Sequence, residues 1–292
     1  MTQTLVQAWK SARDRLTASG LDSPVIDARL LLEAATGADR TDILTDPHRR
    51  LSEEQTLTLE AYLERRERRE PVSLILGRKG FWNIMLRVTP DVLTPRPDTE
   101  ALVDVCLKAF PPGRPFHMLD LGVGSGAILL AILAERPAAK GLGIDISDEA
   151  LAVARDNAAQ LGLESRTALL RGDWTALLGD ATFDLVVSNP PYIPSAEIET
   201  LDPEVRDHEP RHALDGGPDG LDAYRTLAPE VLRVLKPGGL VVLEVGPGQA
   251  EPVRALLEAA GAVDLAVSRD YGGRERVVAG RKKSLGTPGS IR

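Results

Sequence analysis

The five residues from Ser188 to Tyr192 place an asparagine, two prolines and a tyrosine directly after "FDLVV", a pattern typical of a buried strand. Proline has a fixed φ angle and no N–H, so this segment forms a rigid shelf at the end of the strand. The Asn189 side-chain carbonyl and the Pro190 backbone carbonyl are two acceptors, which match the two donors of a planar –NH2 group. Tyr192 offers that group a flat face. The shelf therefore indicates binding of an amide or an aromatic amine.

Nitrogens of this kind are poor nucleophiles because their lone pair is delocalised into a π system. Holding both N–H bonds and aiming the nitrogen at an electrophilic methyl group is catalysis by positioning, and it requires no histidine, serine or cysteine base. We assign the catalytic role to Asn189, Pro190 and Tyr192. The expected substrate-binding residues are Asn189, Pro190, Pro191 and Tyr192.

A second group of candidate residues lies in "LDLGVGSGA", between an expected strand and an expected helix. Glycines there let the backbone bend sharply and approach a ligand. Asp145 follows about 20 residues later at the end of the next strand, where a carboxylate can accept both hydroxyls of a ribose. A helix-capping role for Asp145 is the alternative. A nicotinamide dinucleotide and S-adenosylmethionine both fit this pattern. The cofactor-binding residues expected here are Gly122, Val123, Gly124, Ser125, Gly126 and Asp145.

The third expected strand ends in "RGDW", at the edge where open α/β sheets bind ligands. Asp173 can accept the exocyclic amine of an adenine, and Trp174 can lie against its ring. The alternative is that Asp173 caps a short helix and Trp174 belongs to the core. We add Asp173, Trp174 and Asn189 to the expected cofactor site.

The elements that must position these residues alternate regularly from His117 onward. Because strands and helices alternate, we expect a doubly wound, mostly parallel sheet. The last two strands are joined by a link too short for a helix, so they should form an antiparallel hairpin. The seven expected strands are 117–122, 141–146, 167–173, 183–189, 239–246, 263–271 and 275–281.

The first part of the chain contains only helical patterns. Ser52 to Gln55, "SEEQ", fits a capping box that opens one of the helices. From Ser73 the pattern alternates, with a turn near Trp82, which predicts a β-hairpin. The expected organisation is a helical domain over 1–72, a hairpin linker over 73–97, a sheet domain over 98–281 and a disordered tail over 282–292.

Composition narrows the class of protein. The chain has 292 residues and a net charge of −8, which argues against a broad surface for direct nucleic-acid binding. Cys106 is the only cysteine and is expected in the core, and we expect no metal site. The beginning of the chain lacks the apolar run of a signal peptide, and no stretch is long enough to span a bilayer. We expect a cytoplasmic monomer with no membrane contact.

Taken together, several blocks resemble one family. "SNPPY" resembles the motif of methyltransferases that act on amino groups conjugated to a π system. The blocks "VLTPRPDTE", "DLGVGSGAI", "GDW", "SNPPYIP", "EPRHALDGGPDGL", "LEVGPGQ" and "DYGGRERVVAGR" together resemble the release-factor glutamine methyltransferase (HemK/PrmC) family. The resemblance covers nearly the whole chain. It departs at Ser73-Leu74, where an aromatic residue is usual, and at Thr94, where isoleucine is frequent.

This resemblance implies a seven-stranded Rossmann-like methyltransferase sheet and a small N-terminal helical domain that recognises the substrate. It implies S-adenosyl-L-methionine as cofactor and S-adenosyl-L-homocysteine as product. The implied substrate is the glutamine of the Gly-Gly-Gln loop in peptide chain release factors. The cofactor positions match Gly122 to Gly126, Asp145, Trp174 and Asn189, and the substrate shelf matches Asn189 to Tyr192.

Two further segments are expected near the site. Arg96 to Glu100 should approach the methionine end of the cofactor, with Asp98 as the N-cap of the following helix. His208, Glu209 and Arg211 are expected in a loop over the active site.

Three other functions remain open. They are a ribosomal-protein glutamine methyltransferase, an adenine methylase acting on DNA or RNA, and a nucleotide-sensing module without turnover. The "RPDTE" segment favours a release-factor methyltransferase over a ribosomal-protein methyltransferase. The net negative charge of the chain argues against an adenine methylase.

Overall fold

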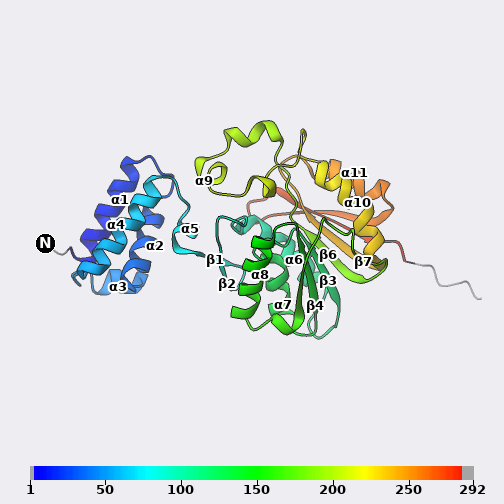
Figure 1. The fold of residues 1–292 in the computed structure, drawn as a ribbon, viewed down its shortest axis with the longest axis horizontal. Helices are drawn as coiled ribbons and strands as arrows, with labels where there is room; N and C mark the ends of the chain where they lie inside the picture. Colours follow the sequence, from blue (N-terminus) through cyan, green and yellow to red (C-terminus); the bar gives the residue numbers. More distant parts are fainter. Residues whose placement is uncertain (1–2, 285–292) are drawn as a thin grey trace, which may run out of the picture. The chain divides into compact units, whose positions relative to one another are not determined.

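The computed structural model describes residues 3–284, and its chain divides into two compact units. The helical unit consists of Met1–Arg78 together with Asp202–His208. The sheet unit consists of Lys79–Leu201 and Glu209–Arg292 (Figure 1). Residues 285–292 of the tail that was expected to be disordered lie outside the described residues, and the expectation is wrong for Lys282, which ends the last strand of the sheet. No helix among the described residues is long and apolar enough to cross a membrane.

The helical unit packs its helices around a leucine-rich core that includes Leu16, Leu31 and Leu63. The capping box predicted at Ser52 is present: its hydroxyl accepts the Gln55 N–H, and the Gln55 side chain accepts the Ser52 N–H. The helices of this unit are α1 (Leu5–Ala18), α2 (Pro24–Thr36), α3 (Arg40–Thr45), α4 (Glu53–Glu67), α5 (Val72–Leu76) and α9 (Pro203–Arg206).

A buried cluster of charges joins three segments of the helical unit. The Arg66 guanidinium on α4 donates to the Asp27 carboxylate on α2 at 2.8 Å. It also donates to the Glu204 carboxylate on α9 at 3.1 Å. Arg66 is 7% exposed, so these partners replace the water that the guanidinium loses on folding. Through Glu204, the 202–208 segment is attached to helices far away in the sequence.

The segment after α4 differs in part from the expected hairpin. Residues 73–76 belong to helix α5. Pro71 precedes this helix, and Gly77, whose backbone is in the left-handed region, ends it. Leu74 and Ile75 are adjacent in sequence and both buried, which a helix permits and an alternating strand does not. The hairpin itself is formed by β1 (Arg78–Phe81) and β2 (Ile84–Arg87).

The sheet unit contains seven strands in the order β5-β4-β3-β6-β7-β9-β8. Pairing is parallel from β5 through β7, and β9 pairs antiparallel with both β7 and β8. This confirms the predicted doubly wound sheet with its antiparallel C-terminal hairpin. The strands are β3 (His117–Leu121), β4 (Lys140–Asp145), β5 (Thr167–Arg171), β6 (Phe183–Ser188), β7 (Leu235–Glu244), β8 (Ala262–Arg269) and β9 (Glu275–Lys282).

Helices cover both faces of this sheet (Figure 1). Leu185 and Val187 face one apolar core, and Val186 between them faces the other, because successive side chains of a strand point to opposite faces. Cys106 is buried in the first core, as predicted. That core is covered by α6 (Glu100–Ala109), α7 (Ala127–Glu135) and α8 (Asp148–Gln160), and the second by α10 (Asp222–Val234) and α11 (Ala250–Ala259). Short 3₁₀ turns are η1 (Pro97–Thr99), η2 (Glu164–Arg166), η3 (Ser195–Thr200) and η4 (Arg211–Ala213).

The Arg66 cluster leads to a prediction about stability. Asp27→Asn leaves the buried guanidinium with Glu204 as its remaining carboxylate, so the free energy of unfolding should fall by about 3 kcal/mol. Asp14→Asn is the matched control, because Asp14 pairs with Arg13 on the surface and its side chain is 65% exposed. It should change stability by less than about 0.5 kcal/mol. Urea denaturation followed by circular dichroism measures both, and equal effects would refute a special role for the buried cluster.

Candidate active site

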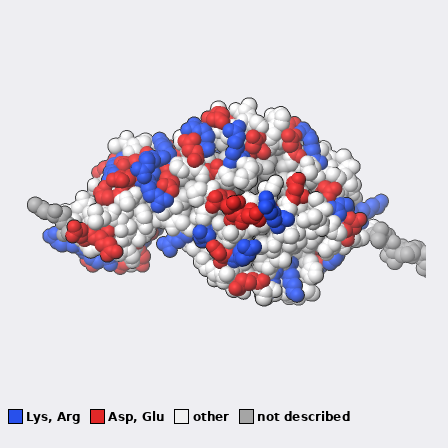
Figure 2. Space-filling view, viewed as in Figure 1, with Lys and Arg blue, Asp and Glu red and all other residues white. Residues whose placement is uncertain are grey.

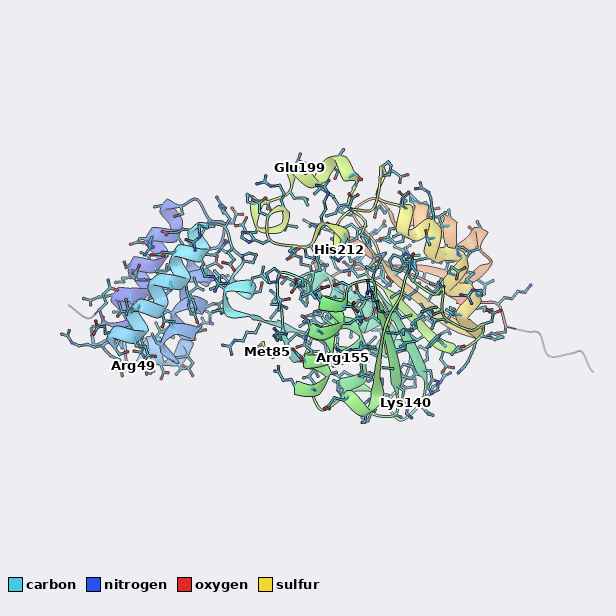
Figure 3. All side chains as sticks on the ribbon, viewed as in Figure 1. Arg49, Met85, Lys140, Arg155, Glu199 and His212 are labelled. Atoms are coloured by element: carbon cyan, nitrogen blue, oxygen red, sulfur yellow. The ribbon has the colours of Figure 1, made fainter. Side chains whose placement is uncertain are left out.

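One cavity of about 290 Å³ lies at the edge of the sheet where the parallel strands end. Open α/β sheets bind ligands at this edge. Figure 3 shows His212, which lines the cavity, at the opposite end of the sheet unit from Lys140, the first residue of β4. The structure brings most of the predicted site residues together here. They are Gly122, Val123, Gly124, Ser125, Asp145, Asp173, Trp174, Asn189, Pro190 and Pro191.

The glycine turn after β3 needs its glycines for two different reasons. Gly122, Gly124 and Gly126 all have positive φ angles, of 72°, 51° and 83°, a region that other residues rarely adopt. A Cβ atom on Gly126 would also lie 2.8 Å from Leu130 Cδ1, whereas one on Gly124 would meet no atom within 4 Å. Gly126 therefore allows the turn to pack on α7, and Gly124 leaves space on the side of the turn that borders the cavity.

Asp145 connects the glycine turn to the next helix. Its two carboxylate oxygens accept the backbone N–H groups of Gly124 at 2.9 Å and Ser147 at 3.0 Å. Ser147 is the N-cap of α8, so the capping role that was the alternative for Asp145 belongs to Ser147. Each carboxylate oxygen has a second lone pair. Asp145 can therefore brace the turn and still accept a ligand hydroxyl from the cavity.

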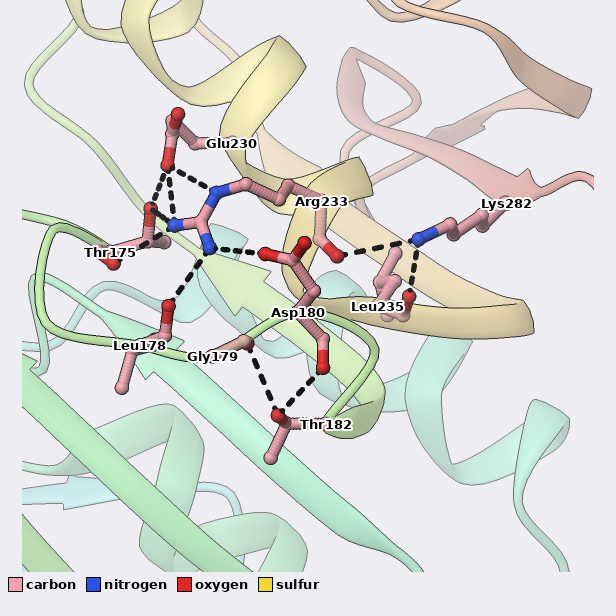
Figure 4. A network of polar contacts seen from close by, with 9 residues as sticks. All are labelled: Thr175, Leu178, Gly179, Asp180, Thr182, Glu230, Arg233, Leu235 and Lys282. Atoms are coloured by element: carbon pink, nitrogen blue, oxygen red, sulfur yellow. Dashed lines mark hydrogen bonds and ion pairs between the residues drawn. The ribbon is translucent and has the colours of Figure 1, made fainter.

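The loop that carries Asp173 and Trp174 is attached to α10. Arg233 donates to the Leu178 carbonyl at 2.8 Å and to the Asp180 carboxylate at 2.8 Å, as Figure 4 shows. Trp174 has a φ angle of 50°, and the residues after it form a turn and not the short helix considered from the sequence. A strained residue persists when the structure around it is well fixed. The Arg233 hydrogen bonds attach the residues that follow Trp174 to α10.

The shelf lies beside the glycine turn, as its position after β6 predicted. Asn189 Nδ2 donates to Thr99 Oγ1 at 3.4 Å, which leaves Oδ1 as the acceptor of the Asn189 amide. Tyr192 differs from its neighbours, because it is not among the residues that line the cavity. Its ring packs against the second core and against Gly246, and its carbonyl accepts from Gln249 at 2.9 Å. Burial raises the pKa of Tyr192 to about 12.

The segment before α6 forms a wall of the cavity that sequence reasoning foresaw only in part. Arg96 and Thr99 line the cavity. The expected approach of 96–100 to the methionine end of the cofactor stays a prediction. The N-cap role of Asp98 is wrong: the chain enters α6 through a 3₁₀ turn, and the Asp98 carboxylate accepts from Arg276 at 3.0 Å. Sequence reasoning missed Asp91, Val92, Leu93 and Pro95, although they belong to or adjoin the quoted "VLTPRPDTE" block.

The expected loop over the site also differs in detail. His208 belongs to the helical unit, and Arg211 pairs with Glu199 at the surface. Glu209 is buried and accepts from Arg96 at 2.6 Å, so it supports the cavity wall. The residues of this loop that do line the cavity are His212 and Ala213, which sequence reasoning did not single out.

Below the glycine turn lies a buried carboxyl group that the sequence analysis also missed. Asp120 is 1% exposed and accepts the Leu129 N–H at 3.1 Å. Burial, together with the charge of Asp145, raises the pKa of Asp120 to about 8. Near neutral pH its proton therefore lowers the negative charge beneath the cavity.

Comparisons with known proteins agree with this geometry. Residues 7–77 match the family model of the PrmC N-terminal domain, and residues 115–257 match a methyltransferase domain. A release factor glutamine methyltransferase from Caulobacter vibrioides is 65% identical over 288 residues, which cover 99% of this chain and 100% of that protein. The chain belongs to the release factor glutamine methyltransferase family. Another member, from Rhodospirillum rubrum, is 48% identical and covers 93% of this chain and 83% of its own.

Membership in this family confirms the resemblance inferred from the sequence blocks. Residues 115–257 of the sheet unit form a methyltransferase domain. A methyltransferase from Pyrococcus furiosus has a similar structure, with a TM-score of 0.50 and 19% identity over 68% of this chain and 88% of that one. At this identity the similarity concerns the fold alone.

The position of Asp145 leads to a prediction about cofactor binding. Asp145→Ala should weaken binding of S-adenosylmethionine by about 1–3 kcal/mol, the range for a lost hydrogen bond to a charged group. Asp148→Ala is the control, because Asp148 lies in the first turn of α8 and pairs with Arg171 at the surface. Calorimetry should show normal affinity for the control and no binding of a nicotinamide dinucleotide to the unaltered protein. Unchanged affinity in a folded Asp145→Ala protein would remove Asp145 from the cofactor site.

Proposed function

We propose that this protein methylates the side-chain amide nitrogen of the glutamine in the Gly-Gly-Gln motif of peptide chain release factors. The donor is S-adenosyl-L-methionine, and the product is S-adenosyl-L-homocysteine. One observation carries the proposal: Asn189 and Pro190 line the same cavity as the glycine turn and Asp145. An amide-binding shelf therefore stands beside a nucleoside-binding turn.

The lining of the cavity fits the cofactor. The glycine turn allows close approach of the backbone, Asp145 offers acceptors to the ribose hydroxyls, and Asp173 with Trp174 offers an acceptor and a ring face to adenine. When bound, the cofactor supplies an electrophilic methyl group. Asn189 Oδ1 and the Pro190 carbonyl would hold the two N–H bonds of the glutamine amide and aim its nitrogen. One amide proton would pass to solvent water during or after transfer, which leaves the methylated amide neutral.

The part of Tyr192 in this scheme stays a prediction. Its ring packs against Gly246 and the second core, so stacking of a substrate amide on it requires the ring to become exposed to the cavity. A monomeric state and a cytoplasmic location also stay predictions.

The alternatives differ in substrate or in turnover. An adenine methylase needs a surface for nucleic acid, but the net charge is −8, and on the face in Figure 2 basic and acidic side chains are interspersed. A ribosomal-protein glutamine methyltransferase would use the same shelf. A nucleotide-sensing module would bind cofactor without turnover.

Mass spectrometry decides among these functions. The protein is incubated with S-adenosylmethionine carrying a labelled methyl group and with a release factor, ribosomal proteins or DNA. We expect label on the release-factor peptide that contains Gly-Gly-Gln, located at the glutamine by fragmentation. Label on a ribosomal protein or on DNA instead, or on none of them, would overturn the proposal.

Asn189 gives the sharpest test of the shelf. Asn189→Ala removes one of the two acceptors, so turnover with saturating cofactor should fall roughly 100-fold or more, as when a preorganised catalytic hydrogen bond is lost. Cofactor affinity should change much less. Asn83→Ala is the control, because Asn83 lies in the β1–β2 turn and donates to Glu135 away from the cavity. If turnover of Asn189→Ala stayed near normal, the shelf would be structural only.

We further propose that the helical unit, expected over 1–72 and extending through Arg78, recognises the release factor. The shelf accepts any primary amide, so selection of one glutamine must come from contacts elsewhere. The helical unit exposes apolar side chains, Val25 at 52%, Ile26 at 53% and Leu57 at 66%, which are available for a partner. Binding energy from such remote contacts would lower the KM of the intact factor.

Replacing these three residues by serine tests this recognition. The KM for intact release factor should rise, whereas that for a Gly-Gly-Gln peptide should stay constant, because the peptide lacks the remote surface of the factor that the helical unit would contact. A control variant with Val263 and Val267 on β8 replaced by serine should affect neither substrate. Methylation rates are measured for each variant with each of the two substrates. Equal losses with factor and peptide would indicate damage to folding and not to recognition.

A further inference from the structure

A buried carboxyl group lies next to the shelf and has no part in the scheme above. Glu244 is the last residue of β7 and is 1% exposed. The preceding residue, Leu243, pairs with Ser188 on β6 in parallel register. Glu244 and Asn189 are therefore the next residues after this pair on two adjacent strands. Within residues 3–284, Glu244 Oε2 is buried without a hydrogen-bond partner. Such a carboxyl group is costly to bury, and a role at the site would account for it.

Thr99 connects this carboxyl group to Asn189. The Thr99 side chain lies within hydrogen-bonding reach of the Glu244 side chain, and Thr99 Oγ1 accepts from Asn189 Nδ2 at 3.4 Å. Thr99 is 4% exposed and lines the cavity. A hydroxyl group has a single proton, and an ionised carboxylate can only accept. Thr99 must therefore donate to ionised Glu244, and its lone pairs are left to accept from Asn189.

We propose that Glu244 and Thr99 are positioning residues that fix the orientation of the Asn189 amide, with Oδ1 directed at the substrate nitrogen. The inference rests on the proposed function. Rotating the Asn189 amide group by half a turn would exchange Oδ1 and Nδ2. The N–H donors of Asn189 would then face the N–H donors of the substrate. The chain from Glu244 through Thr99 prevents this because only the N–H side of Asn189 can bond to the hydroxyl oxygen.

The charge of Glu244 depends on the groups around it. Burial raises the pKa of Glu244 to about 7, opposed by the Thr99 hydrogen bond and by the charges of Arg276 and Arg96, and aided by Asp98. The titratable rings of Tyr192 and Tyr224 also lie near it. The Tyr224 hydroxyl donates to the Glu244 backbone carbonyl at 2.8 Å, so it does not replace Thr99 at the carboxylate.

This environment couples the orientation of Asn189 to pH. Once protonated, Glu244 can donate to Thr99, and the Thr99 hydroxyl can then donate to Asn189 Oδ1. Asn189 Oδ1 is then no longer available to accept an N–H bond of the substrate amide. Ionised Glu244 is therefore the active form, and kcat should fall as the pH decreases through about 7.

Three variants of the full-length protein test the proposal, with release factor and S-adenosylmethionine as substrates. Thr99→Val removes the hydroxyl and keeps the shape, so kcat should fall about tenfold, while the Kd for S-adenosylmethionine stays close to normal. Thr99→Ser restores the hydroxyl and should restore kcat. Glu244→Gln keeps a side-chain carbonyl that accepts from Thr99 but cannot titrate. It should retain activity and lose the acidic decrease in kcat.

Tyr224→Phe is the matched control. It removes a buried hydrogen bond beside Glu244 without touching the carboxyl group, so it should lower the Tm and leave the pH profile of kcat unchanged. Normal kcat in Thr99→Val, or an unchanged acidic decrease in Glu244→Gln, would overturn the proposal. If Glu244→Gln does not fold, the contrast between Thr99→Val and Thr99→Ser still decides. Absence of methylation by the unaltered protein is a separate result, which refutes the proposed function instead.

Discussion

The site depends on the parallel pairing of β3 with both β4 and β6. Leu121 at the end of β3 pairs with Ile144 on β4 and with Ser188 on β6. Parallel strands end at one edge, so this register brings the glycine turn, Asp145 and Asn189 to a single cavity. Apolar side chains on both faces hold the strands in register, because a slip of one residue would exchange the faces. The chemistry at the edge is therefore as well fixed as the core below it.

Two carboxyl groups are buried near the cavity, and their burial costs stability only when they are ionised. The pKa of Asp120 is raised to about 8 and that of Glu244 to about 7, in both cases mainly by burial. The folded protein therefore binds more protons than the unfolded chain between the ordinary carboxyl range and these values. The stability that these groups contribute is fully present at acidic pH and is lost as the pH rises through their folded-state pKa values. Strongly shifted groups of this kind concentrate at functional sites.

The chain between the shelf and the cavity wall serves both units. After Leu201 it enters the helical unit, where Glu204 accepts from Arg66, and at Glu209 it returns to the sheet unit. Glu209 then accepts from Arg96, which lines the cavity. Glu204, which pairs with Arg66, and Glu209, which pairs with Arg96, therefore lie only five residues apart in the sequence. The helical unit is therefore joined covalently to the sheet unit at both ends of the 202–208 segment and after Arg78.

The sequence by itself determined the elements and residues whose signals are local. The alternating pattern after His117, the glycine turn, the capping box at Ser52 and the rigid shelf depend on backbone preferences and on neighbours within a few residues. The blocks around them were sufficient to indicate the family. Even the edge of the sheet that holds the site follows from the order of strands and helices.

Only the tertiary structure decided which side chains meet across long separations in the sequence. Asp98 bonds to Arg276 instead of capping its helix, and the Tyr192 ring packs against Gly246 instead of lining the cavity. Thr99 connects Asn189 to Glu244, although each of the three lies in a different part of the chain. No local pattern encodes these contacts, because a side chain takes the partner that burial and close packing place beside it.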